Sequence, residues 1–452
     1  MRKKAVISNK IYLNCSKGSD LQHKLESELT YEINQQPISE FPLVIRHLTR
    51  ISDTVVTFPA GRVDLIPEDY EIVDKRSYED ADIPEPSFTL RENQAEANDY
   101  FSDGMSGIIN CKPGWGKSIC AMGLIAKYQL KTLIVTTTTV IRDMWVKEIK
   151  QHFGIEPCVI GGGRVINPES PIAVGNIQTV EKIIQKESGT YGMLIIDECH
   201  HCSANTFTKV LNVSRASIKI GLSGTLTRRD GKHVLFNDFF GSKRFVGKDE
   251  NRMKPTVWVY RSAVQIPSNS MIPWARRANA VMEDPRHLSD VIFITKILEQ
   301  LGHRVLVVAD RVEFLEKAHK ALPYSLIIAK NMAATAEERE IVMNAVKQGK
   351  ALSLCATQSI FSEGVSLNEL SALVAGSLIS SEELLEQLIG RVQRPADGKL
   401  SPIVVDIRLE GETARRQFYN RKALYTREGW EVKEMSRAAM LDLVKQHEQT
   451  IS

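Results

Sequence analysis

The sequence predicts an α/β protein: two tandem units built on parallel sheets, with a small α+β module before them and a short helical tail after them. Two stretches, beginning near residues 87 and 288, alternate short apolar strand-like runs with amphipathic helix-like runs. This alternation is typical of parallel sheets covered by helices on both faces. The chain of 452 residues is long enough for about three domains of roughly 150 residues each.

Residues 1–85 are expected to form the small module. Apolar, β-branched runs predict strands at 11–15, 42–45, 54–58 and 62–66. Apolar residues at helical spacing, ending at Leu29 and Ile33, predict a helix over 20–33. Residues 51–85 carry ten acidic and three basic side chains. Prolines and acids at 80–86 indicate an extended linker.

The first parallel-sheet unit is expected at 87–260, the second at 288–425, with a linker at 261–287 between them. In the first unit the patterns predict strands at 107–110, 132–136, 172–174, 193–196 and 218–222, and helices at 119–128 and 140–153. In the second they predict strands at 304–309, 325–328, 351–356, 372–375 and 402–405, and helices at 289–301, 312–321 and 335–348. Residues 411–452 are expected to be amphipathic and helical, with 426–452 as the tail.

Composition and charge exclude several classes of protein. The 58 basic and 55 acidic side chains leave a net charge of +3, so any nucleic-acid surface must be local. No apolar run approaches the ~18 residues of a membrane span, and no signal-type stretch follows Met1. Seven cysteines, an odd number, favour reduced thiols in a cytoplasm. Cys199 and Cys202 have Cys-x-x-Cys spacing, but the sequence lacks a second pair to complete a zinc site.

A glycine-rich loop, Cys-Lys-Pro-Gly-Trp-Gly-Lys-Ser at 111–118, lies between a predicted strand and a predicted helix. In this context glycines let the backbone approach phosphates, and amides at the helix N-terminus donate to them. Lys117 would reach the β- and γ-phosphates and Ser118 would hold Mg²⁺. The residues expected around the nucleotide are Pro113, Gly114, Trp115, Gly116, Lys117 and Ser118. The alternative is a chance glycine-rich turn, and Cys111 replaces the usual first glycine.

Two carboxylates follow an apolar strand about 80 residues later, in Met-Leu-Ile-Ile-Asp-Glu-Cys-His at 193–200. Such a strand delivers them to the carboxyl edge of the sheet, where ligands bind in open α/β folds. Asp197 would orient Mg²⁺ through water, and Glu198 would polarise an attacking water. Two acids that merely solvate a strand end are the alternative, which the neighbouring phosphate loop disfavours.

The motif Asp-Glu-Cys-His at 197–200 resembles the DExH box of superfamily 2 helicases and translocases, and further motifs occur in that family's order over about 87–425. Arg91 and Gln94 resemble the adenine-reading Q-type motif. Ser223-Gly-Thr225 resembles motif III, which together with His200 couples hydrolysis to movement in the family. The resemblance implies two RecA-like lobes that use ATP and Mg²⁺.

The second lobe carries the remaining family motifs. Thr357 and Glu363-Gly364-Val365 resemble motif V, where Gly364 would lie near the nucleotide and Ser366 replaces a residue that is often acidic. Gln387, Arg391 and Arg394 resemble motif VI. In the family these arginines reach across the cleft between the lobes, where they can stabilise the transferring phosphoryl group.

The resemblance also implies nucleic-acid contacts at the edge away from ATP. The residues expected there are Thr138, Gly162, Gly163, Thr179, Arg228, Arg311 and Thr357. Small hydroxyl and glycine positions suit phosphate contacts that ignore base identity. The run Thr136–Thr139 replaces the usual Pro-Thr of motif Ia, and a glycine or threonine in a loop is otherwise only a turn residue.

Two further segments suggest nucleic-acid contacts. Arg228-Arg-Asp230 is similar to an Arg-Glu-Asp element of XPB-like helicases, and the strand-like runs 244–246 and 256–260 could form a β-hairpin with a basic tip that splits a duplex. A solvated, charged linker is the alternative for the hairpin. Trp274-Ala-Arg-Arg277 could stack a base, but an ordinary interdomain anchor is the favoured alternative.

The chain resembles UvsW-type phage branch-migration helicases and XPB-like helicases. This resemblance implies an ATP-dependent DNA helicase that acts on forks and junctions in recombination, replication and repair. We expect a monomer without an obligate protein partner. An RNA helicase fits the same motifs, because the 2′-OH preference is not written in them. A nucleotide-binding scaffold without turnover is disfavoured by the intact set Lys117, Asp197, Glu198, Arg391 and Arg394. A small-molecule phosphotransferase is disfavoured by the second lobe.

Overall fold

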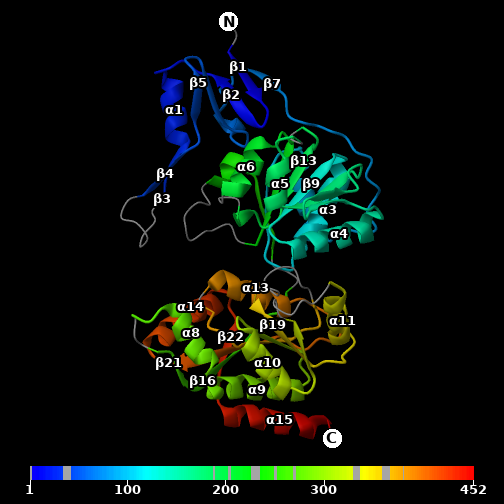
Figure 1. Ribbon diagram of the computed structural model, residues 1–452, viewed down its shortest axis with the longest axis vertical. Coiled ribbons are helices and arrows are strands. Elements are labelled where there is room, and N and C mark those ends of the chain that lie inside the picture. The colour runs from blue at the N-terminus through cyan, green and yellow to red at the C-terminus, as the bar shows by residue number, and fades with distance from the viewer. Residues whose placement is uncertain are drawn as a thin grey trace. The chain divides into compact units, whose positions relative to one another are not determined.

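The computed structural model describes residues 3–33, 42–186, 189–201, 205–224, 235–248, 252–267, 271–328, 336–358, 367–379 and 381–451. The chain divides into two compact units, Met1–Asp249 and Glu250–Ser452 (Figure 1). The expected α/β class with two parallel-sheet lobes is confirmed. None of the helices in the described ranges is both long and apolar enough to cross a membrane.

The first unit begins with a small α+β module. Its elements are β1 (Lys4–Ile7), β2 (Lys10–Asn14), α1 (Asp20–Glu28), β3 (Thr30–Ile33), β4 (Leu43–Arg46), β5 (Thr49–Ser52), β6 (Val55–Pro59), η1 (Val63–Leu65) and β7 (Glu71–Asp74). Five strands form a sheet in the order β5-β6-β2-β1-β7, and β3 pairs with β4 in a separate antiparallel ribbon. The sheet and α1 enclose a core that includes Ile11, Leu13, Leu25 and Phe58.

Two expectations for this module are wrong. The helix predicted over 20–33 ends at Glu28, and the chain turns into β3, so Ile33 is buried from a strand. Leu29 serves as the C-cap, and the run Thr-Tyr-Glu-Ile that follows is rich in the β-branched and aromatic residues that favour strands. The strand predicted over 62–66 is instead a short 3-10 helix, η1.

The first lobe follows in the same unit. Its elements are α2 (Glu92–Tyr100), β8 (Gly107–Asn110), α3 (Lys117–Tyr128), β9 (Thr132–Thr136), α4 (Thr139–Phe153), β10 (Cys158–Gly161), β11 (Arg164–Ile166), β12 (Ile172–Asn176), α5 (Ile177–Ile183), β13 (Met193–Ile196), η2 (Cys199–His201), α6 (Asn205–Val213), β14 (Ile218–Ser223), α7 (Phe236–Phe240) and β15 (Arg244–Val246). The sheet order is β11-β10-β12-β9-β13-β14-β8-β15, and all neighbours are parallel except β10 and β11.

Apolar clusters cover both faces of this sheet. One contains residues of α3 and α4 such as Ile125 and Trp145. The other contains residues of α5, α6 and α7 such as Val180 and Phe240. Because every parallel strand ends at the same edge, the loops after β8, β9, β12, β13 and β14 meet there. That edge carries the residues singled out from the sequence.

The second unit is one all-parallel sheet. Its elements are β16 (Thr256–Gln265), α8 (Trp274–Met282), α9 (Pro285–Gln300), β17 (Val305–Ala309), α10 (Val312–Ala321), β18 (Ser325–Ile328), α11 (Ala336–Lys347), β19 (Ser353–Thr357), β20 (Ala372–Ala375), α13 (Glu382–Val392), β21 (Ile403–Glu410), α14 (Glu412–Arg427), β22 (Glu431–Met435) and α15 (Arg437–Ile451). The strand order is β18-β19-β17-β20-β21-β16-β22. Helices α8, α9, α10 and α15 contribute to the core on one face, and α11, α13 and α14 to the core on the other.

The structure corrects three expectations near the lobe boundaries. Strand β15 pairs with β8 in the first sheet, whereas β16 pairs with β21 and β22 in the second. The hairpin predicted from 244–246 and 256–260 is therefore wrong. Residues 256–260 belong to the second sheet rather than to a lobe ending at 260, and β16, α8 and the start of α9 occupy the stretch expected as linker. The tail is helical except for β22, and α15 packs on α9 as expected.

Candidate active site

The glycine-rich loop connects β8 to α3, as predicted. Gly114 and Gly116 have φ values of +88° and +95°, which L side chains rarely adopt. A Cβ on Gly116 would lie 2.3 Å from Gln94 Nε2, so the loop requires glycine there for space as well. The Lys117 ammonium donates to the Cys111 carbonyl at 2.8 Å. The loop therefore holds its lysine over its own backbone at the N-terminus of α3, where phosphates bind in such folds.

Arg91 and Gln94 hold this loop in place. At the start of α2 the Arg91 amide donates to Gln94 Oε1 at 3.0 Å, which fixes the Gln94 side chain. Gln94 Nε2 donates to the Gly116 carbonyl at 3.3 Å, and the Arg91 guanidinium donates to the Trp115 carbonyl. The sequence-predicted Q-type residues are thus next to the loop, although a direct contact with adenine stays a prediction.

Asp197 and Glu198 follow β13 at the carboxyl edge, two strands from β8. Asp197 Oδ2 accepts a hydrogen bond from the Trp145 indole at 2.8 Å, and its Oδ1 accepts one from the Glu198 amide at 2.9 Å. Glu198 has φ +51°, an uncommon value outside glycine. These bonds fix the Asp197 carboxylate and turn the chain so that the next carboxylate projects from the same edge.

Burial and the neighbouring Glu198 raise the pKa of Asp197 to about 6, while the Trp145 indole and the Lys117 ammonium lower it. The buried Asp197 carboxylate and the half-buried Glu198 carboxylate repel each other, and a divalent cation would offset that repulsion. Together with the Ser118 hydroxyl at the start of α3, the donors are hydroxyl and carboxylate oxygens, the ligands that Mg²⁺ prefers. The residues present therefore fit a nucleoside triphosphate with Mg²⁺.

His200 and Ser223 connect the carboxylate pair to the next strand. His200 Nδ1 lies 3.1 Å from Ser223 Oγ and 3.3 Å from Glu198 Oε2, and both His200 and Ser223 are buried. The Cys111 amide donates to the Ser223 carbonyl at 3.0 Å. The phosphate loop, the DExH box and motif III are thus in direct contact in the first lobe. Thr225 lies outside the described residues.

In the second unit Gln387 and Arg391 lie on α13, and Arg394 follows its end. Arg391 is buried and Arg394 half-buried. The Lys399 ammonium donates to the Arg394 carbonyl at 2.6 Å, and the Met253 amide donates to the Gln393 carbonyl at 2.9 Å. These bonds fix the backbone around the motif VI arginines. Gly364, Glu363 and Ser366 lie outside the described residues.

Four of the expected nucleic-acid positions gather at the carboxyl edge of the first lobe. Thr138 is the N-cap of α4, after β9, and its hydroxyl accepts from the Ile141 amide at 3.3 Å. Gly162 and Gly163, with φ +59° and +76°, make the exposed two-residue turn between β10 and β11. Thr179 lies in the first turn of α5, after β12. Strands β9, β12 and β10 are neighbours, so these residues share one side of the edge.

In the second unit, Arg311 and Thr357 follow two paired strands, because Ala309 of β17 is opposite Thr357 of β19. Arg311 Nε donates to Asn279 Oδ1 of α8 at 2.8 Å, and Thr357 is buried. Their nucleic-acid contacts stay predictions. Arg228 and Cys202 lie outside the described residues.

Sequence reasoning missed Trp145, a fully buried side chain of α4 that bonds Asp197. Its position on the apolar face of a predicted helix indicated only core packing, and its indole N–H gave no separate signal. The Trp274 motif proves to anchor elements within the second unit. Arg277 lies 5.6 Å from the Trp274 ring and donates to the Pro267 carbonyl and the Thr413 hydroxyl, each at 2.6 Å.

Two family models match the chain: "Type III restriction enzyme, res subunit" at residues 87–228 and "Helicase conserved C-terminal domain" at 286–396. The protein named probable helicase D10, of Escherichia phage T5, is 41% identical over 451 residues, which cover 98% of each chain. The chain belongs to the superfamily 2 helicases. This helicase is also 26% identical over 335 residues to a DNA 3'-5' helicase XPB of Kineococcus radiotolerans, with 70% of this chain and 58% of the relative covered.

A solved structure agrees with the two-lobe fold. The helicase matches S. cerevisiae Dbp5 bound to RNA and ADP BeF3 with a TM-score of 0.58 and 10% identity, covering 80% of this chain and 93% of the other. It also matches T4 UvsW at 17% identity over 97% of this chain and 100% of the other, with a TM-score of 0.41. The resemblance to superfamily 2 helicases inferred from the motifs is confirmed, and with it an ATP-driven helicase.

Proposed function

We propose that this helicase uses ATP and Mg²⁺ to remodel forked or branched DNA in the cytoplasm of a bacterial host. The observation that carries the DNA part is the N-terminal module: it has its own core and belongs to the same compact unit as the first lobe. A motor that only follows a single strand needs no more than its two lobes. A third module fixed to one lobe would therefore supply a second DNA-binding site. The name of one relative, a DNA 3'-5' helicase XPB, supports DNA as the substrate.

The first lobe supplies the groups for phosphoryl transfer. Lys117 would neutralise charge at the β- and γ-phosphates, Ser118 and Asp197 would hold Mg²⁺, which polarises the phosphates when bound, and Glu198 would take a proton from the attacking water. The Trp145 indole fixes Asp197 at 2.8 Å. His200, which lies 3.1 Å from Ser223 Oγ, would link the state of this site to motif III.

Replacing Glu198 with Gln separates nucleotide binding from chemistry. The amide keeps the shape of the side chain but cannot accept the proton, so we expect ATP to bind while turnover falls by about 10² or more. Phosphate release and the Kd for a fluorescent ATP analogue measure the two effects. The matched variant Glu181→Gln changes an acid of α5, in the same lobe, that pairs instead with Lys209 at 2.9 Å, and should leave both unchanged. Loss of nucleotide binding by a folded Glu198→Gln protein would contradict the role as a base.

The N-terminal module is proposed to bind the duplex arm of a branch. Lys17 is exposed just before α1, and Lys24 is exposed on α1. Lys10 is half-buried on β2. Lys3 lies 3.1 Å from Asp69, and Lys4 lies 3.8 Å from Glu71. Their charge is thus partly balanced by these acids. Phosphate binding by Lys10, Lys17 and Lys24 would be blind to base sequence and sensitive to salt.

A panel of nucleic acids tests this proposal. For the wild type we expect stronger stimulation of ATP turnover by a four-way junction than by plain duplex or RNA. The triple variant Lys10→Ala, Lys17→Ala, Lys24→Ala should bind the junction about tenfold more weakly and with a shallower salt dependence, because up to three phosphate contacts are lost. Stimulation by single-stranded DNA should survive. A triple variant with wild-type junction affinity would remove the module from the proposal, and preferential stimulation by RNA would favour the RNA helicase.

A further inference from the structure

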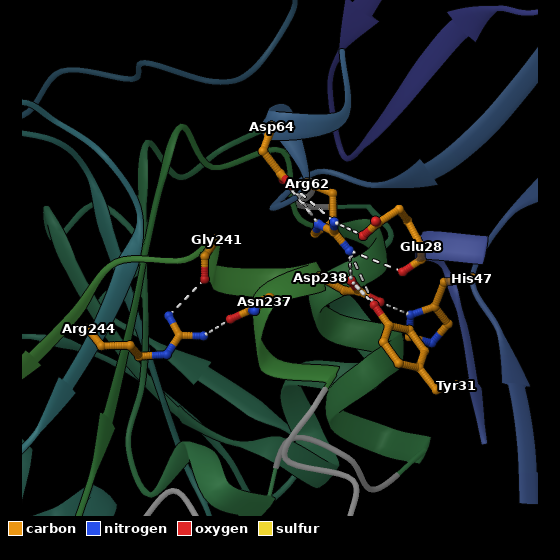
Figure 2. A network of polar contacts seen from close by, with 9 residues as sticks. All are labelled: Glu28, Tyr31, His47, Arg62, Asp64, Asn237, Asp238, Gly241 and Arg244. Carbon is orange, nitrogen blue, oxygen red and sulfur yellow. Dashed lines mark hydrogen bonds and ion pairs between the residues drawn. The ribbon is translucent and has the colours of Figure 1, made fainter. Parts of the chain in front are cut away.

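The segment from Phe236 to Gly247 follows motif III in the chain, and it contacts both the phosphate loop and the N-terminal module. It comprises α7, a short connection and β15, and it begins twelve residues after Gly224 of motif III. Figure 2 shows its polar contacts with the module. We refer to residues 236–247 as the strap.

At one end the strap holds the module through Asp238, whose side chain is completely buried. Three residues of the module meet this carboxylate (Figure 2): His47 Nδ1 lies 2.5 Å from Oδ2, the Tyr31 hydroxyl donates to Oδ1 at 2.7 Å, and Arg62 Nη1 lies 3.4 Å from Oδ1. A buried carboxylate is costly unless it is paired and hydrogen-bonded. The contacts satisfy Asp238 only while the module is docked.

Backbone hydrogen bonds and apolar contacts also join the module to α7. The Gly61 amide of the module donates to the Asp238 carbonyl at 2.9 Å, and a Cβ on Gly61 would lie 2.7 Å from the carbonyl oxygens of Asn237 and Asp238. Tyr31 and Ile45 of the β3–β4 ribbon pack against the first lobe's core, and the His47 ring lies 5.7 Å from that of Phe239. The ribbon is therefore built onto α7.

At its other end the strap touches the phosphate loop. Strand β15 pairs with β8, which leads into the loop, and the Gly247 amide donates to the Asn110 carbonyl at 3.2 Å. A Cβ on Gly247 would lie 2.5 Å from Cys111 Sγ and 2.6 Å from Trp115 Nε1. Within the strap, Arg244 donates to the Asn237 side chain at 2.6 Å and to the Gly241 carbonyl at 2.7 Å (Figure 2). These hydrogen bonds connect α7 to β15, so the two elements link the phosphate loop to the module.

We propose that the strap couples the nucleotide site to the N-terminal module, with Asp238 as the positioning residue that transmits the change. The inference deepens the proposed function, because it assumes that the module binds a branch. Coupling requires a connected set of contacts that respond to both ligands. The contacts run from the phosphate loop through Gly247, Arg244 and α7 to Asp238, and from there to Tyr31, His47 and Arg62. If the module were only a stabilising cap, its loss would cost stability but would not link the two ligands.

The measurement that separates these roles is reciprocity. If an ATP analogue changes the affinity for a four-way junction by some factor, the junction must change the affinity for the analogue by the same factor. For the full-length wild type, with a non-hydrolysable ATP analogue and a fluorescent four-way junction, we expect a factor of about five or more in both directions, in the range typical of coupled sites. The same pair of titrations is run with single-stranded DNA and with RNA.

Asp238→Asn keeps the size of the side chain but removes the charge that holds Arg62 and His47. In this variant, the ATP analogue and the four-way junction should each change the affinity for the other by less than about twofold. Gly61→Ala disturbs the contact between the module and α7 without changing a charge, because its methyl group meets the α7 backbone. It should lower both affinity factors in the same way. Asp64→Asn is the matched control: it removes another partner of Arg62, at 3.0 Å, but leaves the contacts of Asp238 in place, and should keep the wild-type factor. Thermal unfolding of each variant identifies those that are folded.

Wild-type factors in folded Asp238→Asn and Gly61→Ala proteins would overturn the coupling role, as would a factor of one in the wild type with every nucleic acid. Failure of the proposed substrate has a different signature. If RNA or single-stranded DNA rather than the junction shows the reciprocal factor, and Asp238→Asn removes it, the strap couples the sites but the branch is the wrong ligand. If the triple lysine variant loses junction affinity while Asp238→Asn keeps the factor, the module binds the branch without the strap.

Discussion

Replacing Lys117 with Ala is expected to lower ATP turnover by about 10³ or more in a phosphate-release assay. The ammonium lies at the N-terminus of α3, held over the Cys111 carbonyl at 2.8 Å, and is close enough to Asp197 to lower its pKa. In that position it would neutralise the charge that grows between the β- and γ-phosphates, a role that alanine cannot fill. Alanine is a good helix former, so α3 should stay intact.

The control for this variant is Lys127→Ala in the last turn of the same helix. Lys127 donates to the Asn98 carbonyl at 3.3 Å and lies 3.7 Å from Asp99, away from the loop. Its loss should leave turnover within about twofold of the wild type, because exposed ion pairs contribute little to stability. Near-wild-type hydrolysis by Lys117→Ala would remove the loop from the active site.

The sequence predicted the strands and helices of the lobes well where apolar periodicity was strong. The ranges 132–136, 193–196, 312–321, 325–328 and 372–375 match β9, β13, α10, β18 and β20. Buried parallel strands are continuous apolar runs bounded by polar residues, and each is decided locally. The helix over 20–33 failed for the converse reason: Leu29 and Ile33 keep the helical spacing, but both are buried from outside α1, one at its C-cap and one on β3.

Long-range pairing could not be predicted from local pattern. Runs 244–246 and 256–260 look like the arms of a hairpin, yet β15 completes the first sheet and β16 the second. Only the partner strands β8, β21 and β22 decide between these outcomes, and they lie far away in the sequence. The phosphate loop and the Asp-Glu pair were found because motif spacing encodes their chemistry locally.

The Asp238 cluster could not be found in the same way. Tyr31, His47, Arg62 and Asp238 are ordinary residues scattered over about 200 positions, and no spacing links them. Their role arises from the docking of the β3–β4 ribbon on α7, which depends on the tertiary fold. Trp145 is a similar case, since its bond to Asp197 spans 52 positions.

Arg394→Ala is expected to leave nucleotide affinity within about threefold of the wild type and to lower turnover by about 10³, the scale of an arginine that stabilises a transferring phosphoryl group. The first lobe holds the phosphate loop, its Q-type residues and the Asp-Glu pair, so binding should not need Arg394. In the role that the family resemblance implies for Arg394, the chemical step would gain from its positive charge as charge develops on the phosphoryl group. Phosphate release and the Kd of a fluorescent ATP analogue measure the two quantities separately.

Two further variants make this test specific. Arg394→Lys keeps the charge but loses the planar fork that matches phosphate oxygens, so it should recover only a small part of the lost turnover. Arg416→Ala removes an exposed arginine of α14, in the same unit, and should leave turnover unchanged. A folded Arg394→Ala protein with full turnover would show that the second lobe does not act in the chemical step.

The double variant Lys117→Ala, Arg394→Ala decides whether the two residues work on one reaction. When two residues act together in one chemical step, the effects of their substitutions on turnover do not add, because the second residue contributes little once the first is lost. We therefore expect the double variant to be about as slow as Lys117→Ala alone, rather than slower by a further factor of about 10³. Full additivity would instead place Arg394 in a separate step, such as the closure or opening of the lobes, and would be visible as a change in the dependence of turnover on nucleic acid.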